Sequence, residues 1–153
     1  MSVRMETHIA TELGQKTCAR SLLQFEIPGG VAPPISAAAQ RAAINSVCEK
    51  LRCLLSAIAG AHGFRSQIVR AHSLAVAEVP WFHAVQFNAA GALEGIDLLD
   101  PAIDPSELAR GGEILVSRLI GLLVIFIGDG LTVSILHEIW PQIGERSQDQ
   151  GES

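Results

Sequence analysis

The 153-residue sequence contains no tyrosine and few charged residues, which make up only 18% of the chain. Asp and Glu outnumber Lys and Arg by 16 to 11, and the sparse aromatic residues do not alternate with basic ones. The sequence therefore lacks the charge pattern of a general nucleic-acid-binding protein. Hydrophobic residues account for 48% of the chain and the mean hydropathy is +0.32, which excludes intrinsic disorder of the whole. The length predicts one domain.

Cysteine is also scarce, and the odd count of three is not typical of a disulfide framework. Cys48 and Cys53 point in different directions if they share a helix, so they are not expected to pair. We expect both, together with Cys18, to be small apolar side chains in a core. Met1 to Gly14 has no apolar run of the kind that a signal peptide needs, and the expected location is the cytoplasm.

Residues 1–33 are predicted to form an arm or strand, partly flexible, ahead of the main domain. Apolar residues stand at every fourth position from Met5 to Leu13, which suits a short helix, whereas Leu23–Ile27 alternates apolar and polar residues, which suits a strand. A single helical domain is predicted over 34–141. The polar residues 142–153 are predicted to be a disordered tail.

Two helices are predicted at the start of the main domain. The first begins at Ser36, whose side chain can cap it, and carries its apolar residues on one face. These residues are Ile44, Val47, Cys48, Leu51, Leu54, Leu55 and Ile58. Gly60 and Gly63 mark the end of this helix. The second is predicted from Phe64 to Val79, because Pro80 displaces the residue before it from the helical region.

A β-hairpin is predicted at 82–96. Side chains alternate up to Phe87, Gly91 is expected to take a left-handed conformation in the turn, and Ala92–Ile96 returns as the second strand. An isolated hairpin is marginal in water, so it must pack on the helices or pair with the predicted strand near the N-terminus. Trp81 and Phe87 are candidate walls of an apolar ligand pocket between the hairpin and the helices.

A further helix start is predicted at Asp104–Glu107, with a capping acid, a proline and a second acid in order. Gly111 and Gly112 are expected to interrupt that short helix. A long helical segment then covers Glu113–Trp140. We therefore predict a mainly α fold, a bundle of three or four helices around this segment with a small β-hairpin.

The segment 113–140 has three faces. Its first face is a heptad-like apolar seam with one acid in the middle. The residues of this seam are Leu115, Leu119, Leu122, Phe126, Asp129, Val133, Leu136 and Trp140. The second face is also apolar, and the third is a stripe of small residues that lets another helix approach closely. The stripe consists of Ser117, Gly121, Gly128 and Thr132.

The uncharged run from Leu119 to Gly128 is ten residues long, whereas a membrane span needs about 20. A buried central helix is therefore favoured over membrane insertion. Two interpretations of Asp129 stay open. Either the helix breaks at the flanking glycines and Asp129 caps the next helix, or Asp129 binds a cation or pairs with Arg118 of a second copy.

No residue pattern predicts catalysis, a metal site or a cofactor site. His137 and Glu138 lack the second histidine of a zinc-protease helix, and the acids between 97 and 104 are not spaced as in a calcium loop. Glycine pairs occur without a P-loop or a dinucleotide-binding fingerprint. We therefore expect no catalytic residue, no metal and no cofactor.

Several short motifs follow one another after the first predicted helix. They are Gly63-Phe64-Arg65, Glu78-Val79-Pro80-Trp81, Asn88 to Gly91 with Leu93-Glu94-Gly95, and Leu122-Leu123-Val124 leading to Phe126-Ile127-Gly128. In this order they resemble a set of small uncharacterised bacterial α-helical proteins, over residues 34–141. The resemblance implies a bacterial origin and a single helical unit. That family has no established activity, so the resemblance implies no site residues.

The function expected from these patterns is a non-enzymatic interaction or regulatory module. Its apolar helix surface exceeds what one short chain is expected to cover, which favours self-association, or a protein partner, through the C-terminal helix. The expected contact residues are Ser117, Leu119, Gly121, Phe126, Gly128, Asp129, Thr132 and Trp140. A small-molecule sensor with a pocket at Trp81 and Phe87 is one alternative. A membrane-associated component is the other, and no nucleic-acid partner is expected.

Overall fold

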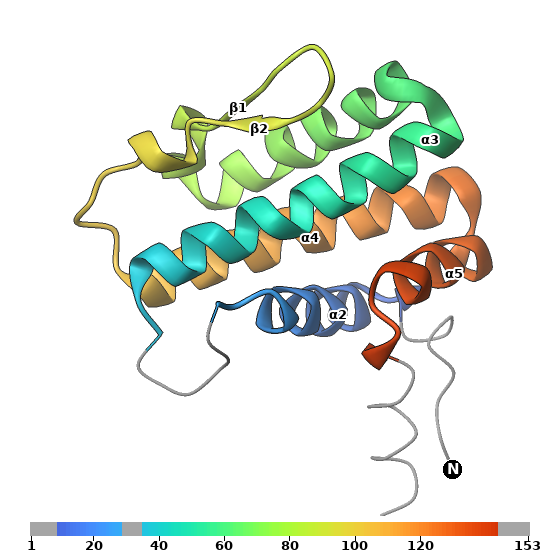
Figure 1. Ribbon diagram of the computed structural model, residues 1–153, viewed down its shortest axis with the longest axis horizontal. Helices are drawn as coiled ribbons and strands as arrows, with labels where there is room; N and C mark the ends of the chain where they lie inside the picture. The colour runs from blue at the N-terminus through green and yellow to red at the C-terminus, as the bar shows by residue number, and fades with distance from the viewer. Residues whose placement is uncertain (1–8, 29–34, 144–153) are drawn as a thin grey trace, which may run out of the picture.

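The computed structural model describes residues 9–28 and 35–143. Its architecture is set by the helices α2 (Glu12–Phe25), α3 (Ala37–Glu78), α4 (Pro105–Ile127) and α5 (Asp129–Ile139). A two-stranded antiparallel hairpin, β1 (Gln86–Phe87) and β2 (Leu93–Glu94), lies beside α3 on the side away from α2 (Figure 1). The prediction of a mainly α fold with a small β-hairpin is confirmed.

The prediction of a strand at Leu23–Ile27 is wrong, because this part of the chain belongs to α2 and the turn after it. Thr11 begins the helix by accepting a hydrogen bond from the Gly14 N–H at 3.0 Å. The buried side chains share one helical face, namely Cys18, Ala19, Leu22 and Leu23. The apolar residues of this segment fit both a helical face and the alternating pattern of Leu23–Ile27. The helix forms because its apolar face is buried against α4. Residues 12–25 are thus part of the bundle and not an arm ahead of it.

Residues 1–8 and 29–33 of the predicted arm, and 144–153 of the predicted tail, lie outside the described residues.

The two helices predicted on either side of Gly60 are the two halves of α3. Ser36 caps the first half as predicted, accepting from the Ala39 N–H at 3.1 Å. At Gly60 the backbone has φ 82° and ψ 160°, a combination that is essentially restricted to glycine. The second half therefore turns and runs back along the first (Figure 1). It ends at Glu78, one residue earlier than predicted, and Val79 is its C-cap directly before Pro80.

The hairpin forms where predicted but is shorter. Residues Pro80–Ala84 form a 3-10 helix that buries Phe82, and the Phe82 carbonyl oxygen lies 2.8 Å from His72 Nε2. Because this helix includes residues up to Ala84, the first part of the alternating segment lies outside the sheet. Gly91 has the predicted left-handed backbone, with φ 85°. The turn is closed by Asn88, whose Oδ1 accepts from two backbone N–H groups of the loop.

Asp104 caps α4 as predicted, accepting from the Ser106 N–H at 2.9 Å. The expected interruption at Gly111 and Gly112 is wrong, because α4 continues through both. A methyl group added at Gly111 would lie 2.6 Å from the Trp81 ring, and one at Gly112 would lie 2.7 Å from an Ile44 side-chain carbon. These glycines therefore allow close packing on α4 and do not break it.

The helical segment does break at Gly128, which separates α4 from α5 with φ 87° and ψ 160°. This confirms the break that the glycines around Asp129 suggested. The capping residue was predicted one position too late, since Gly128 is the cap and Asp129 is the first residue of α5. The Asp129 Oδ1 accepts from the Gly130 N–H at 2.8 Å. Its negative charge at the helix start is favourable.

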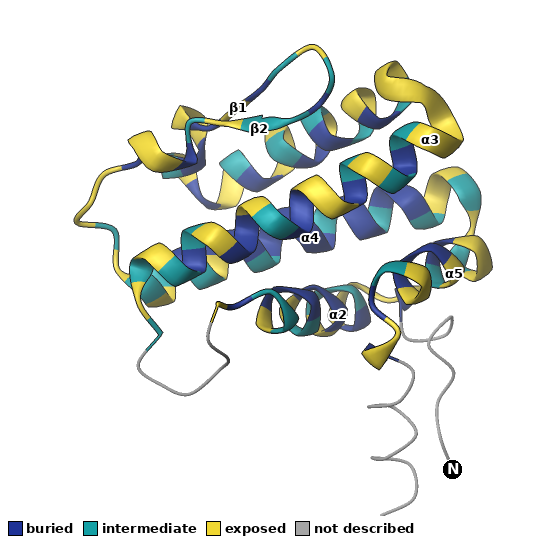
Figure 2. Ribbon diagram, viewed as in Figure 1, coloured by how far each residue is buried: buried dark blue, intermediate teal, exposed yellow. Residues whose placement is uncertain are grey.

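The core lies where α2, α3 and α4 face one another, and Figure 2 shows the buried residues on these inward faces. The thiols of Cys18 and Cys48 are buried there, and burial raises the pKa of each to about 12. Cys53 is exposed, so its predicted place in the core is wrong. Within residues 9–28 and 35–143, no helix is long and apolar enough to cross a membrane.

Candidate functional site

The predicted stripe of small residues is used for packing within the chain. Ser117 is buried and donates to the Ile114 carbonyl, and Thr132 is fully buried and donates to the Gly128 carbonyl at 2.7 Å. A methyl group at Gly121 would lie 2.8 Å from Oε1 of Gln15, so α2 covers this part of α4. The stripe does not present one continuous face to a second molecule.

The predicted seam is also largely internal. Leu119 and Trp140 are each only 1% exposed. The break at Gly128 places the two ends of the seam on different helices, so it is not a single line. Of the large apolar residues predicted to mediate contacts, Phe126 differs by being 58% exposed. Asp129 is partly buried at the start of α5.

Trp140 belongs to a polar cluster around Glu26 that the sequence did not reveal. Glu26, just after α2, accepts hydrogen bonds from Ser46 Oγ and Lys50 Nζ, both at 2.6 Å, and from Trp140 Nε1 at 2.9 Å. Burial raises the pKa of this carboxyl, but the three hydrogen bonds and the Lys50 charge together outweigh it and lower the pKa. The cluster joins the ends of α2 and α5 to α3.

The hairpin aromatics also pack internally. The Trp81 ring stacks on Phe82 with centroids 4.5 Å apart, and its Nε1 donates to Glu107 at 3.3 Å. Phe87 is buried and meets the His72 ring edge-on at 5.4 Å. Trp81 and Phe87 thus contact other side chains and do not line the pocket described next.

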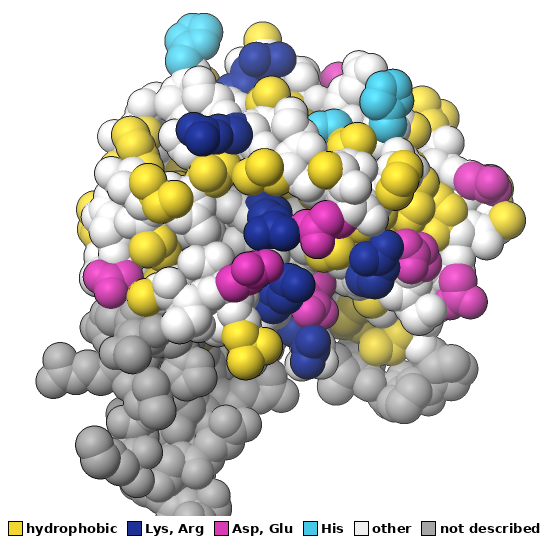
Figure 3. All heavy atoms as spheres, turned by 180° about the vertical axis from the view of Figure 1, so that it is seen from behind, with side chains coloured by type: hydrophobic (Ala, Val, Ile, Leu, Met, Phe, Trp, Pro, Cys, Tyr) yellow, Lys and Arg dark blue, Asp and Glu magenta, His cyan; other side chains and the backbone are white. Residues whose placement is uncertain are grey.

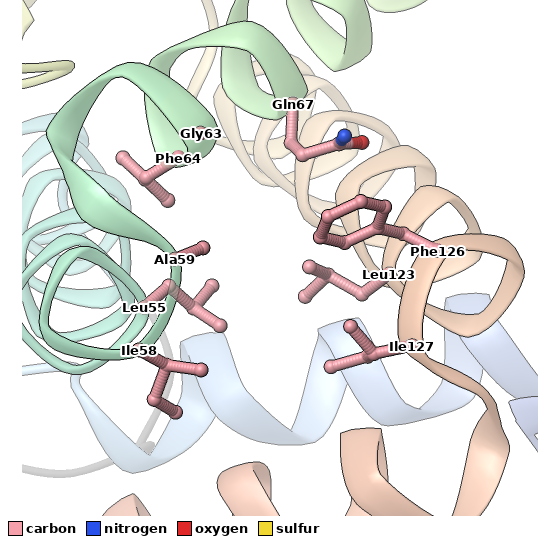
Figure 4. A pocket seen from close by; sticks show the side chains of 9 residues that line it. All are labelled: Leu55, Ile58, Ala59, Gly63, Phe64, Gln67, Leu123, Phe126 and Ile127. Carbon is pink, nitrogen blue, oxygen red and sulfur yellow. The ribbon is translucent and has the colours of Figure 1, made fainter.

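A pocket of about 270 Å³ lies between α3 and the last turns of α4 (Figure 4). It is lined by Leu55, Ile58, Ala59, Gly63, Phe64, Gln67, Leu123, Phe126 and Ile127. Buried side chains form its floor, including Leu55, Phe64 and Leu123. Ile58 and Phe126 are 53% and 58% exposed, so they mark its mouth. The pocket thus combines a buried apolar floor with an apolar rim open to solvent.

Two glycine breaks shape this pocket. Because α3 reverses at Gly60, residues from both of its halves face the pocket, and α4 ends at Gly128 just after Phe126 and Ile127. The two glycines have nearly the same backbone angles, and a methyl group at either would meet no atom within 4 Å. Glycine is therefore required here by the backbone conformation and not by lack of space.

Gln67 is the one pocket-lining residue with a polar side chain. It is partly buried, and its amide makes no hydrogen bond with any residue in the described part of the chain. In Figure 4 it extends from α3 toward Phe126 of α4. The pocket is thus uncharged and offers one uncommitted amide.

Sequence reasoning identified a single member of this pocket, Phe126, as a site residue. It assigned Leu55 and Ile58 to the apolar face of the first predicted helix and placed Phe64 at the start of the second. The available signal was the pair Gly60 and Gly63 beside apolar residues, which marks a reversal of the chain. That signal does not reveal which part of α4 lies opposite.

The charged side chains of the described surface are extensively paired. Figure 3 shows acidic and basic groups intermixed on the rear face and not separated by sign. Arg118 pairs with Glu78 and, at 3.6 Å, with Glu12, and Arg20 makes two hydrogen bonds to Glu113. The hydrogen bond from Arg118 holds the pKa of Glu78 below its ordinary value. Arg118 is thus engaged within the chain and not free to meet Asp129 of a second copy.

In the described residues, no three His, Cys, Asp or Glu side chains are placed to hold a metal ion. Compared with protein-family models, curated proteins and solved structures, the chain shows no significant similarity to any of them. The resemblance to small bacterial proteins therefore stays a prediction.

Proposed function

We propose that this chain is a non-enzymatic binding module that takes a small apolar ligand into the pocket between α3 and α4. The supporting observation is the pocket itself, with its buried floor and a rim at which Ile58 and Phe126 are more than half exposed. A ligand seated there removes its own apolar surface and that of the rim from water, which is favourable.

The volume limits the ligand. About 270 Å³ lies just below the usual range of roughly 300–1,000 Å³ for ligand pockets. A dry apolar cavity of about 150 Å³ is sufficient for benzene. The pocket therefore suits a substituted single ring, or an aliphatic group of similar bulk.

A thermal-shift titration with p-xylene tests the proposal. A ligand at ten times its dissociation constant stabilises the folded state by about 1.4 kcal/mol. For a chain of this size that corresponds to a rise in melting temperature of about 3–6 °C. No saturable rise at any soluble concentration contradicts the proposal.

The matched control comes from two exposed alanines of α3. Ala59 lines the pocket, whereas Ala57 does not and points to a different side of the helix. Ala59→Phe is expected to fill the mouth and abolish the p-xylene shift, whereas Ala57→Phe leaves it. Equal responses of the two variants mean that the binding lies elsewhere.

Self-association is the second candidate, and a different observation favours it. Ile125, Phe126 and Leu131, at the junction of α4 and α5, are 83%, 58% and 48% exposed. We call these three residues the junction patch. Ile125→Glu is expected to abolish self-association while preserving p-xylene binding, because Ile125 does not line the pocket. Light scattering over a concentration series measures the first effect, and a monomeric wild type rules this candidate out.

The proposed setting is the cytoplasm. All three cysteines are free, and two of them are buried as thiols, which suits a reducing compartment. Membrane association through the junction patch is the remaining alternative, and it predicts that the chain is recovered with membranes on fractionation.

A further inference from the structure

We infer that the pocket selects an uncharged ligand with one hydrogen-bonding group, which binds the side-chain amide of Gln67. This inference rests on the proposed function and specifies its ligand class. The p-substituted phenols are the simplest compounds of this kind that match the volume of the pocket.

The exclusion of charged ligands follows from the lining. None of its nine residues is Lys, Arg, His, Asp or Glu. An ionised group that leaves water for such a site loses its hydration without gaining an ion pair, which is strongly unfavourable. A carboxylate or ammonium ligand is therefore expected to bind much more weakly than a neutral compound of the same shape.

The preference for one polar group follows from Gln67. Its amide both donates and accepts hydrogen bonds, so it can form a hydrogen bond with a hydroxyl, a carbonyl or an amide group of a ligand. The amide makes no hydrogen bond within the described part of the chain, so a ligand does not have to displace an internal partner. The other lining side chains have no polar atoms, and a second polar group on the ligand would lose water there without compensation.

The exposed aromatic side chain at the mouth favours a planar ring. Phe126 lies on α4 and is 58% exposed, so its ring can be reached by a ligand (Figure 4). Phe64 is 1% exposed, and its ring packs close to Gly91, so it contributes to the buried floor. A ligand ring that stacks on Phe126 makes an aromatic contact there.

The test compares four probes of closely similar shape: p-xylene, p-cresol, p-toluate and p-methylbenzylammonium. Calorimetric titrations are made with the full wild-type chain, with Gln67→Met, which preserves side-chain length without the amide, and with Gln86→Met as a control. Gln86 is an exposed residue of β1 outside the pocket. The ratio of the p-xylene to the p-cresol dissociation constant is expected to fall about three- to tenfold in Gln67→Met and to stay unchanged in Gln86→Met. The two charged probes are expected to bind much more weakly than p-cresol.

The outcomes separate this inference from the proposed function. If p-xylene binds but the ratio is the same in Gln67→Met, or if p-toluate binds as tightly as p-cresol, the inference is overturned and the proposed function stands. If none of the four probes binds, both are overturned. Circular dichroism spectra of the variants confirm that a lost preference does not come from a lost fold.

Discussion

The two glycines at the start of α5 provide a sharp test of how the pocket is shaped. Gly128 and Gly130 are both exposed, and a methyl group added at either meets no atom within 4 Å. They differ in backbone, because Gly128 has φ 87° and ψ 160° whereas Gly130 lies within α5 and has no positive φ. Comparing Gly128→Ala with Gly130→Ala therefore separates the effect of backbone conformation on stability from that of steric crowding.

The two substitutions are expected to change stability in opposite directions. At Gly128, alanine is forced into a region that is essentially restricted to glycine, which costs about 1–3 kcal/mol. At Gly130, alanine lowers the entropy of the unfolded chain and favours the helix, which stabilises the fold by about 0.5–1 kcal/mol. The expected changes in melting temperature are a fall of about 2–12 °C and a rise of about 1–4 °C.

Urea denaturation followed by circular dichroism measures both free energies of unfolding. A p-xylene titration of Gly128→Ala adds the functional result, since Phe126 and Ile127 directly precede this residue and line the pocket. We expect weaker binding in Gly128→Ala and unchanged binding in Gly130→Ala. If both variants shift stability in the same direction, the backbone explanation of the break is refuted.

Two further predictions concern packing and charge. Gly111→Ala is expected to destabilise the fold by about 1–3 kcal/mol, because its methyl group would lie 2.6 Å from the Trp81 ring. Gly121→Ala is expected to be neutral or stabilising, because the flexible Gln15 side chain can move away from the added methyl group. Urea denaturation compares the two variants, and an equal loss of unfolding free energy in both contradicts this explanation. The folded-state pKa of Glu26 is lowered, so its stabilising contribution is present above the ordinary pKa of 4.5 and is lost as the pH falls through the lowered value. Glu26→Gln is therefore expected to be about 1–2 kcal/mol less stable at pH 7 and to lose less stability than the wild type on acidification; parallel pH profiles of the two proteins contradict the assignment.

Local signals in the sequence predicted the local features of the fold. Ser36, Asp104 and Gly91 each act on residues within a few positions of themselves, and each occurs in the predicted role. A side-chain cap or a left-handed turn depends on short-range geometry, which the neighbouring residues largely determine.

Features that depend on distant residues were predicted less well. The segment Leu23–Ile27 satisfies a strand pattern, but the core formed with α4 selects the helical face of α2. Gly111 and Gly112 are poor helix residues, yet the side chains that pack against them come from distant positions in the sequence. In both cases tertiary packing overrides the local preference.

The pocket was missed for the same reason. Its residues come from both halves of α3 and from the end of α4, and only the reversal at Gly60 brings them together. The small-residue stripe was recognised from its spacing but assigned to a contact with another molecule. The helix that covers part of it is α2 of the same chain, a segment for which the sequence predicts an arm or strand. The apolar surface that the sequence assigned to a partner is therefore partly covered by the chain itself.

The most direct test of the proposed function is a methyl NMR titration of the full chain with p-xylene. The account predicts saturable shifts for the methyl groups of Leu55, Leu123 and Ile127, which line the pocket. It predicts no shift for Leu98, which is 84% exposed and lies outside the pocket. Shifts that do not saturate, or that are as large at Leu98 as in the pocket, would contradict it.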